Sequence, residues 1–313
     1  MAPPASVAVI IAAYNAAETL DQALASALAE PEVAEVCVVD DRSSDATATT
    51  AEAWAARDTR VRVIRQPVNA GPSAARNVAI AATTANWIAI LDADDFFLPG
   101  RLARMLAHGG DADFVADTLI RSTSRTPPPL PAAATAEPRA LSFCAFIRGN
   151  SSKPDDGLDL GFLKPIFRRA FVNQHGLRYV ETMRLGEDYE FYARALALGA
   201  RFLVCGPAGY ISVEREGSLS KDHSAEDLRL LRDCDDGLRR IRPLSRDEDD
   251  ALRRHWGIVD CRLQWRQLIS AVKARNVRAA LATFHSMRAA VYLSIRLAEQ
   301  VWERGAAAAL RRR

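Results

Sequence analysis

The stretch from Trp87 to Asp95 constrains the fold most, because an apolar run of strand length ends abruptly in three carboxylates. The apolar residues stop at Leu91, and Asp92, Asp94 and Asp95 follow at once. In open α/β sheets, ligands gather outside the carboxyl ends of the strands. Two aspartates at this spacing suit a hard divalent cation, Mg²⁺ or Mn²⁺, that also holds substrate phosphates. The alternative is an acidic turn before the next helix, and for Asp92 and Asp94 alone the two interpretations are evenly matched.

Strand-length apolar runs alternate with helical stretches through the first half of the chain. Apolar runs lie at residues 7–11, 36–39, 61–64 and 87–91, and helical stretches follow the first three. This alternation predicts an α/β fold with a mostly parallel sheet and helices on both faces. We expect Asn15 to head the first helix, Ser44 to cap the second, and Pro99 to lie in the first turn of the helix after the acidic run.

The chain divides into two expected domains. Residues 1–222 form the sheet domain, whose first half extends to about 120 and whose second half covers 140–222. Between these halves, residues 121–139 break all periodicity and predict a mobile loop or lid over the sheet. Residues 223–313 are expected to form a helical extension of three segments.

Composition indicates a globular chain with its own cores. Of 313 residues, 49% are hydrophobic and 26% are charged. No window reaches the ~18 uninterrupted apolar residues of a membrane-spanning helix, and the start lacks the pattern of a signal peptide. The five cysteines are scattered, which disfavours a disulfide framework or a zinc site. We therefore expect a cytosolic protein with reduced thiols.

The charge of the chain is unevenly distributed. Residues 261–313 carry eleven Lys or Arg against two Glu, although the whole chain has a net charge of only +2. In the same region, helical spacing places a set of apolar residues near one face: Phe284, Met287, Val291, Ile295, Ala298 and Trp302. These helices could lie on an anionic membrane surface, or equally could pack on their own domain with a basic outer face. Nucleic acid is a weaker interpretation, because the excess charge is confined to one end and aromatic residues are sparse.

Polar residues follow two further strands at the expected rim of the sheet. Tyr14 and Asn15 come after the first strand, and Asp40 and Asp41 end the second. An aromatic face with a carboxylate suits a pyrimidine base, which needs stacking and an acceptor for its ring N–H. A packing tyrosine and ordinary turn aspartates are reasonable alternatives for each residue taken singly. Arg76, at the start of the third helix, could hold a carboxylate or neutralise a diphosphate, or could lie on a solvated face.

Two later segments add candidate groups. Gly186 precedes Glu187 and Asp188, which open a helix ending near Gly199. A carboxylate at a helix N-terminus stays ionised and can accept a proton from an alcohol, although pairing with the helix dipole is the simpler interpretation. His223 could be a third metal ligand, but a lone histidine in a polar loop is more often solvated.

Together these motifs resemble the family-2 glycosyltransferases of the GT-A fold, over about residues 6 to 220. The opening strand and turn match with Ala12 where a proline is usual, and the second turn matches with Arg42 where a glycine is common. The remaining matches are the donor-side loop and helix, the metal and diphosphate motif, and the acidic pair: Asn69, Gly71, Arg76, Asp92-Ala93-Asp94 and Glu187-Asp188.

The resemblance implies an inverting enzyme that uses a UDP-sugar, with Asp188 as the catalytic base and Mg²⁺ or Mn²⁺ held at Asp92 and Asp94. It also implies that Tyr14, Asp40 and Asp41 hold the base and ribose. The processive members carry Gln-x-x-Arg-Trp and membrane spans, and neither pattern occurs in the sequence, which favours addition of a single sugar. The nearest likeness is to succinoglycan-type exopolysaccharide enzymes. These extend a lipid-diphosphate-linked oligosaccharide at the inner membrane face, so UDP-glucose and a peripheral location are expected.

Other function classes fit less well. A nucleotidylyltransferase would need a glycine-rich, basic loop after the first strand, and residues 13–17 do not form one. A dehydrogenase is disfavoured because no G-x-G-x-x-G follows a strand. A non-catalytic sugar-nucleotide sensor or assembly scaffold remains the alternative, and the acidic pair at Glu187 and Asp188 argues against it.

Overall fold

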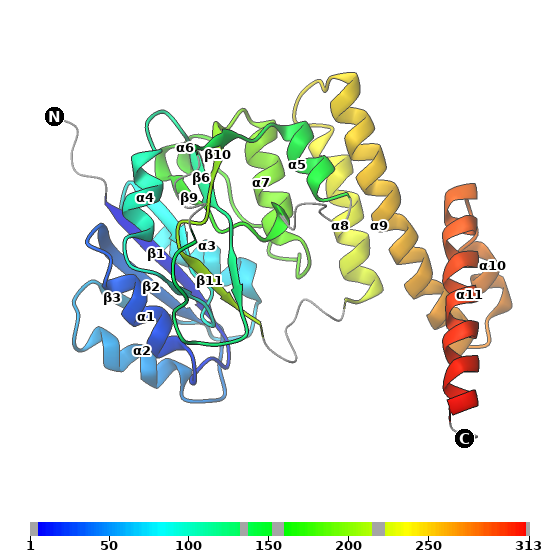
Figure 1. Cartoon of the computed structure of the whole chain (residues 1–313), viewed down its shortest axis with the longest axis horizontal. Coiled ribbons are helices and arrows are strands. Elements are labelled where there is room, and N and C mark those ends of the chain that lie inside the picture. Colours follow the sequence, from blue (N-terminus) through cyan, green and yellow to red (C-terminus); the bar gives the residue numbers. More distant parts are fainter. Residues whose placement is uncertain (1–5, 132–136, 152–159, 215–222, 311–313) are drawn as a thin grey trace. The chain divides into compact units, whose positions relative to one another are not determined.

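A computed structural model describes residues 6–131, 137–151, 160–214 and 223–310 of the chain. It contains two compact units, residues 1–221 and 222–313, which are described separately (Figure 1).

The first unit is built on an eight-stranded sheet in the order β3-β2-β1-β4-β9-β6-β10-β8. Its strands are β1 (Val7–Ala13), β2 (Val33–Asp40), β3 (Val61–Arg65), β4 (Trp87–Ile90), β6 (Phe114–Asp117), β8 (Arg139–Ala140), β9 (Ile166–Arg168) and β10 (Phe202–Cys205). β1 pairs in parallel with β2 and β4, and β2 pairs in parallel with β3. β9 is antiparallel to both β4 and β6, and β8 is antiparallel to β10. The predicted mostly parallel sheet is therefore confirmed.

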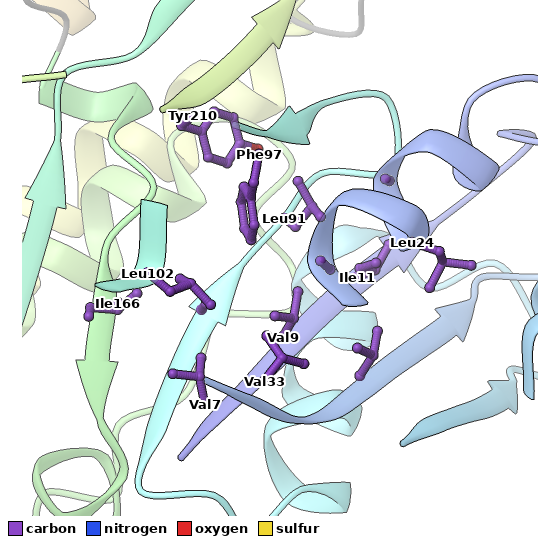
Figure 2. Close-up of a cluster of buried hydrophobic side chains, with 14 of the residues drawn as sticks. Val7, Val9, Ile11, Leu24, Val33, Leu91, Phe97, Leu102, Ile166 and Tyr210 are labelled. Carbon is purple, nitrogen blue, oxygen red and sulfur yellow. The ribbon is translucent and has the colours of Figure 1, made fainter. Parts of the chain in front are cut away.

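Helices accompany this sheet along the chain: α1 (Leu20–Leu28), α2 (Thr47–Ala55), α3 (Pro72–Ala82), α4 (Arg101–Ala107), α5 (Phe143–Gly149), α6 (Arg169–Gln174) and α7 (Glu187–Ala197). The main core lies between the sheet and the helices α1, α2 and α4, and Figure 2 shows Val9 and Ile11 of β1 in the same buried cluster as Leu24 of α1. β1 reads as a continuous apolar run because a central parallel strand is covered on both faces. The carboxyl end of β1 therefore lies at one edge of the sheet, next to the carboxyl ends of β2 and β4.

The first two helices begin later than predicted. α1 begins after Thr19, and the Asn15 side chain instead accepts hydrogen bonds from Ser44. α2 begins after Ala46, where Asp45 and not Ser44 accepts from the Thr47 amide. Asn15 and Ser44 thus join the two rim turns to one another, a tertiary contact that local capping rules do not anticipate.

The helix after the acidic run also begins later than predicted. α4 follows Gly100, so Pro99 lies outside its first turn. The Glu30 carboxylate accepts from the amides of Gly100 and Leu102, and this distant side chain takes the capping role.

The segment expected to be a mobile loop is partly tied to the body. β7 (Ile120–Ser122) joins a second sheet in the order β5-β11-β7, with β5 (Phe96–Phe97) and β11 (Tyr210–Val213), and residues 139–140 pair with β10. The Arg125 guanidinium donates to the carbonyls of Asp94 and Thr19. Residues 132–136 lie outside the described residues, so the mobility of the segment stays a prediction.

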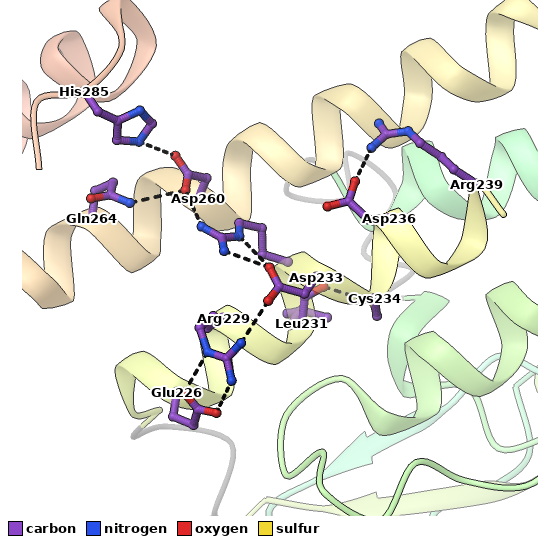
Figure 3. Close-up of polar contacts among 11 residues, drawn as sticks. Glu226, Arg229, Leu231, Asp233, Cys234, Asp236, Arg239, Asp260, Gln264 and His285 are labelled. Atoms are coloured by element: carbon purple, nitrogen blue, oxygen red, sulfur yellow. Dashed lines mark hydrogen bonds and ion pairs between the residues drawn. The ribbon is translucent and has the colours of Figure 1, made fainter.

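The second unit contains α8 (Ala225–Leu238), α9 (Arg246–Lys273), α10 (Val277–Ala282) and α11 (Met287–Leu310), one helix more than predicted. The extra break occurs because Asn276 caps α10 through the Ala279 amide. The buried Asp260 on α9 accepts from Arg232 on α8 and contacts His285 before α11, which ties three parts of the unit together (Figure 3). In the described part of the chain, every helix is too short or too polar to cross a membrane.

Candidate active site

Asp41 organises the rim beyond β2. Its carboxylate is buried and accepts hydrogen bonds from the Ala70 and Gly71 amides at 2.8 and 2.7 Å. Its carbonyl accepts from the Asn69 side chain. Gly71 has φ of 91°, a backbone conformation that glycine adopts without strain, and it directs its amide at Asp41 just before α3. Asp41, Asn69 and Gly71 therefore lie together, and the hydrogen bonds of Asp41 hold the 66–71 loop in its conformation.

The turn beyond β1 presents an aromatic side chain to solvent. Tyr14 is 52% exposed, whereas Ala12 and Ala13 before it belong to the strand. Asn15 has φ of 49°, and its amide donates to the Ser43 hydroxyl. Asp40 is buried and accepts from the Ser43 amide. Hydrogen bonds thus join the turn after β1 to the turn after β2, and the Tyr14 side chain beside them stays exposed.

The acidic run after β4 places three carboxylates close together. The buried Asp95 accepts from the Val213 amide at 2.8 Å, and burial together with the charges of Asp92 and Asp94 raises its pKa to about 7. The Tyr210 hydroxyl accepts from the Asp92 amide and also hydrogen-bonds Asp95. Ala93 is buried, and its carbonyl accepts from Thr19. The run is therefore held by its backbone from both sides.

Two buried cations join the acidic run to the acidic pair of α7. The Arg76 guanidinium lies 2.9 Å from Asp92 and 3.2 Å from both Glu187 and Asp188. The Lys164 ammonium lies 2.9 Å from Asp92 Oδ2 and 2.8 Å from Asp188 Oδ2. Burial alone would raise the pKa of Asp92, but Lys164 and Arg76 outweigh it and hold that pKa well below its usual range. Asp92 consequently stays ionised in this network.

Lys164 is the site residue that sequence reasoning missed. It lies between a short 3₁₀ turn (Leu160–Phe162) and β9, and its side chain is only 7% exposed. The fully buried Arg101 donates to the Lys164 carbonyl and pairs with Asp117 at 2.6 Å. Asp117 also accepts from the Tyr210 amide, so one buried ion pair supports both Lys164 and Tyr210. The available signal was a single lysine two residues before an apolar strand, which alone indicates no role.

The donor set fits a hard divalent cation. Asp92 and Asp94 follow the buried strand β4, and Mg²⁺ or Mn²⁺ commonly takes one or two carboxylate ligands with phosphate and water in the other positions. Both Asp92 oxygens are already paired, Oδ1 with Arg76 and Oδ2 with Lys164, so a metal would share Asp92 with these cations or displace them. No described group of three or more His, Cys, Asp or Glu side chains has the arrangement of an all-protein metal site. His223 belongs to the second unit, and its role as a ligand stays a prediction.

The mostly parallel sheet with this acidic rim defines a glycosyltransferase fold of the GT-A type. Residues 8–174 match the model of glycosyl transferase family 2, and the chain belongs to that family. It is similar to the succinoglycan biosynthesis proteins ExoU and ExoO of Rhizobium meliloti. ExoU is 46% identical over 81% of this chain and 75% of its own length, and ExoO is 41% identical over 76% and 73%.

Solved structures show the same fold. TarS of S. aureus (residues 1–349) in complex with UDP-GlcNAc aligns with a TM-score of 0.65 at 20% identity, over 90% of this chain and 91% of that one. A mannosyltransferase of Pyrobaculum calidifontis in complex with GDP-Man and Mn²⁺ aligns with a TM-score of 0.58 at 16% identity, over 96% and 81%. At these identities the likeness concerns the fold alone. The protein is a glycosyltransferase enzyme.

Proposed function

We propose that this enzyme transfers one sugar from a UDP-sugar to a hydroxyl of a growing, lipid-diphosphate-linked oligosaccharide in exopolysaccharide synthesis. The names of ExoU and ExoO support the process, and the UDP-GlcNAc complex of TarS supports the nucleotide. The observation that carries the proposal is the bridge of Arg76 and Lys164 between Asp92 and Asp188. Each of these two cations contacts both Asp92, in the motif expected to hold the metal and the diphosphate, and Asp188, the candidate base.

The donor nucleotide would bind over the rim turns of β1 and β2. The exposed Tyr14 ring offers a face on which a uracil base can stack. Asp40, with Asp41 and Asn69 behind it, would shape the pocket for base and ribose. The Asp41 carboxylate already accepts three hydrogen bonds, two of them from backbone amides. Asp41 would therefore contribute to donor binding mainly by holding the 66–71 loop in place, and less as a hydrogen-bond acceptor for the base. UDP-glucose is the donor to test first.

Asp188 would act as the base. The acceptor hydroxyl oxygen attacks the anomeric carbon from the face opposite the nucleotide, and its proton passes to the Asp188 carboxylate. The bond from that carbon to the diphosphate oxygen breaks, UDP leaves with the electron pair, and the configuration inverts. Asp188 lies in the first turn of α7, and both of its carboxylate oxygens contact neighbouring cations, Arg76 and Lys164.

Arg76 and Lys164 would also serve the leaving group. Both lie against Asp92, and an incoming diphosphate offers them a further anionic partner at the same place. A divalent cation held by Asp92 and Asp94 would supply further charge stabilisation for the departing diphosphate. The lipid-linked acceptor would bring the enzyme to the inner face of the membrane.

The test is UDP release from a panel of UDP-sugars, with Mn²⁺, with Mg²⁺ and with EDTA, in the presence of lipid-linked acceptor extract. Metal-dependent turnover of one donor supports the proposal and names the sugar. Tight binding of a donor without turnover in every condition would instead favour the non-catalytic sensor or scaffold.

A further inference from the structure

Exposed apolar side chains gather at the end of the second unit. Nine of the thirteen large hydrophobic residues that are exposed in the described structure lie between positions 272 and 302: Val272, Val277, Leu281, Met287, Val291, Ile295, Leu297, Val301 and Trp302. They belong to the end of α9, to α10 and to α11, and both α10 and α11 pack against α9 (Figure 1). We call these nine residues the α10–α11 surface. An apolar group of this extent usually marks a binding surface.

α11 presents an apolar stripe although it already has a packing face. Ala289 and Leu293 are fully buried, and α11 packs against α9. Met287, Val291, Ile295, Ala298 and Trp302 recur at helical spacing on a different side and are all exposed. Met287 is 82% and Trp302 80% exposed. Within its own unit, the stripe is therefore not the face that holds the helix in place.

Basic side chains accompany the α10–α11 surface. Residues 272–302 contain five Lys or Arg and one acidic residue, Glu299. Lys273, Arg275 and Arg278 are all exposed, around the turn that joins α9 to α10. Contact between two copies through this surface would bring like charges together, whereas an anionic lipid surface attracts them. Apolar side chains beside basic ones are the combination that lies in a membrane interface without spanning it.

We infer that the α10–α11 surface docks this enzyme on an anionic lipid bilayer, with α11 lying along the membrane plane. The inference deepens the proposed function, because a lipid-linked acceptor is presented at such a surface. The docking itself needs only the nine apolar residues and the neighbouring cations.

The experiment is co-sedimentation of the full chain with vesicles of phosphatidylcholine alone or mixed with phosphatidylglycerol. The parent protein is expected to bind the mixed vesicles and not the neutral ones, and to be released by salt. Ile295→Glu and Trp302→Glu should each weaken binding by tenfold or more, because a carboxylate must then enter the interface. Arg278→Glu should weaken it by about fivefold or more. Arg253→Glu, on an exposed α9 arginine outside the surface, is the matched control and should bind like the parent.

Two results would overturn the inference. One is that the parent protein binds neither vesicle type, or binds both equally well, so that phosphatidylglycerol makes no difference. The other is a parent dimer in sedimentation velocity that Ile295→Glu converts to a monomer. Thermal melts confirm that each variant folds. Release of UDP from a UDP-sugar, with detergent-dispersed lipid-linked acceptor extract and without vesicles, separates this result from the proposed function. Ile295→Glu should retain this activity, and Asp188→Asn should lose it while still binding vesicles.

Discussion

The Lys164 ammonium lies 2.8 Å from the Asp188 carboxylate, and the same nitrogen contacts Asp92 at 2.9 Å. One side chain therefore links the strand end that carries the acidic run to the helix that carries the candidate base. Arg76 forms the second link between the same two carboxylates. The three carboxylates of the cluster already outnumber its two cations, so removing either cation would increase the excess of negative charge.

Lys164→Met should lower the free energy of unfolding by about 3 kcal/mol at neutral pH, because it leaves the buried Asp188 and the half-buried Asp92 short of a partner. The pKa of Asp92 is lowered in the fold, so its contribution is present above about pH 4 and is lost as the pH falls towards that lowered value. The difference between parent and variant should therefore shrink in acid. Denaturant unfolding at neutral and acidic pH measures it, and a constant difference would contradict the linkage. Lys164→Arg, which keeps the charge, is the control.

Tyr210→Phe should reduce stability by about 1–2 kcal/mol, because the buried hydroxyl contacts both the Asp92 amide and Asp95. The ring packing against Phe97 is retained. We also expect a higher KM for the donor with a smaller change in kcat, since the acidic run loses a support. Unfolding curves and donor titrations test this. Tyr292→Phe on α11 is the control, and equal effects of the two substitutions would contradict the role given to Tyr210.

Asp41→Asn should weaken donor binding indirectly, because Asp41 acts by holding the 66–71 loop and not by contacting the donor. An amide can accept through one oxygen only, and its NH₂ group would face the Ala70 or Gly71 amide that now donates to the carboxylate. The loop from 66 to 71 should become less ordered, and UDP affinity should fall by about 1–2 kcal/mol, roughly 5- to 30-fold. Calorimetric titration of UDP measures the affinity, and unchanged affinity would show that the loop is not part of the donor site.

Asp94→Asn should raise the Mn²⁺ or Mg²⁺ concentration needed for half-maximal turnover, because it removes one hard oxygen ligand. Asp111→Asn removes an exposed carboxylate that pairs with Arg201 and serves as the control. The measurement is a metal titration of UDP release after treatment with EDTA. Identical metal curves for Asp94→Asn and the parent would remove Asp94 from the metal site.

Sequence patterns predicted the features that depend on residues close together in the chain. The apolar runs placed the strands, so the carboxyl ends beside Tyr14, Asp40 and Asp92 could be expected at one rim, as observed. Arg76 was recognised as a possible partner of a carboxylate, and it contacts three.

The misses share one cause, which is contact between residues distant in sequence. Asn15 and Ser44 looked like helix caps, but each satisfies the other across the rim. Lys164 is brought to Asp92 by the antiparallel insertion of β9 beside β4, and strand order in that half of the sheet cannot be read from periodicity. The Arg101–Asp117 pair that holds Lys164 was likewise invisible, because a buried ion pair has no local pattern.

The central claim is that Asp188 accepts the proton of the acceptor hydroxyl. The most direct measurement compares Asp188→Asn with the parent for UDP-sugar affinity and for single-turnover sugar transfer, with a thermal melt to confirm folding. The account predicts donor affinity within a few-fold of the parent and a rate of transfer reduced by about 10²- to 10⁴-fold. Transfer at the parental rate by a folded, donor-binding Asp188→Asn protein would contradict it.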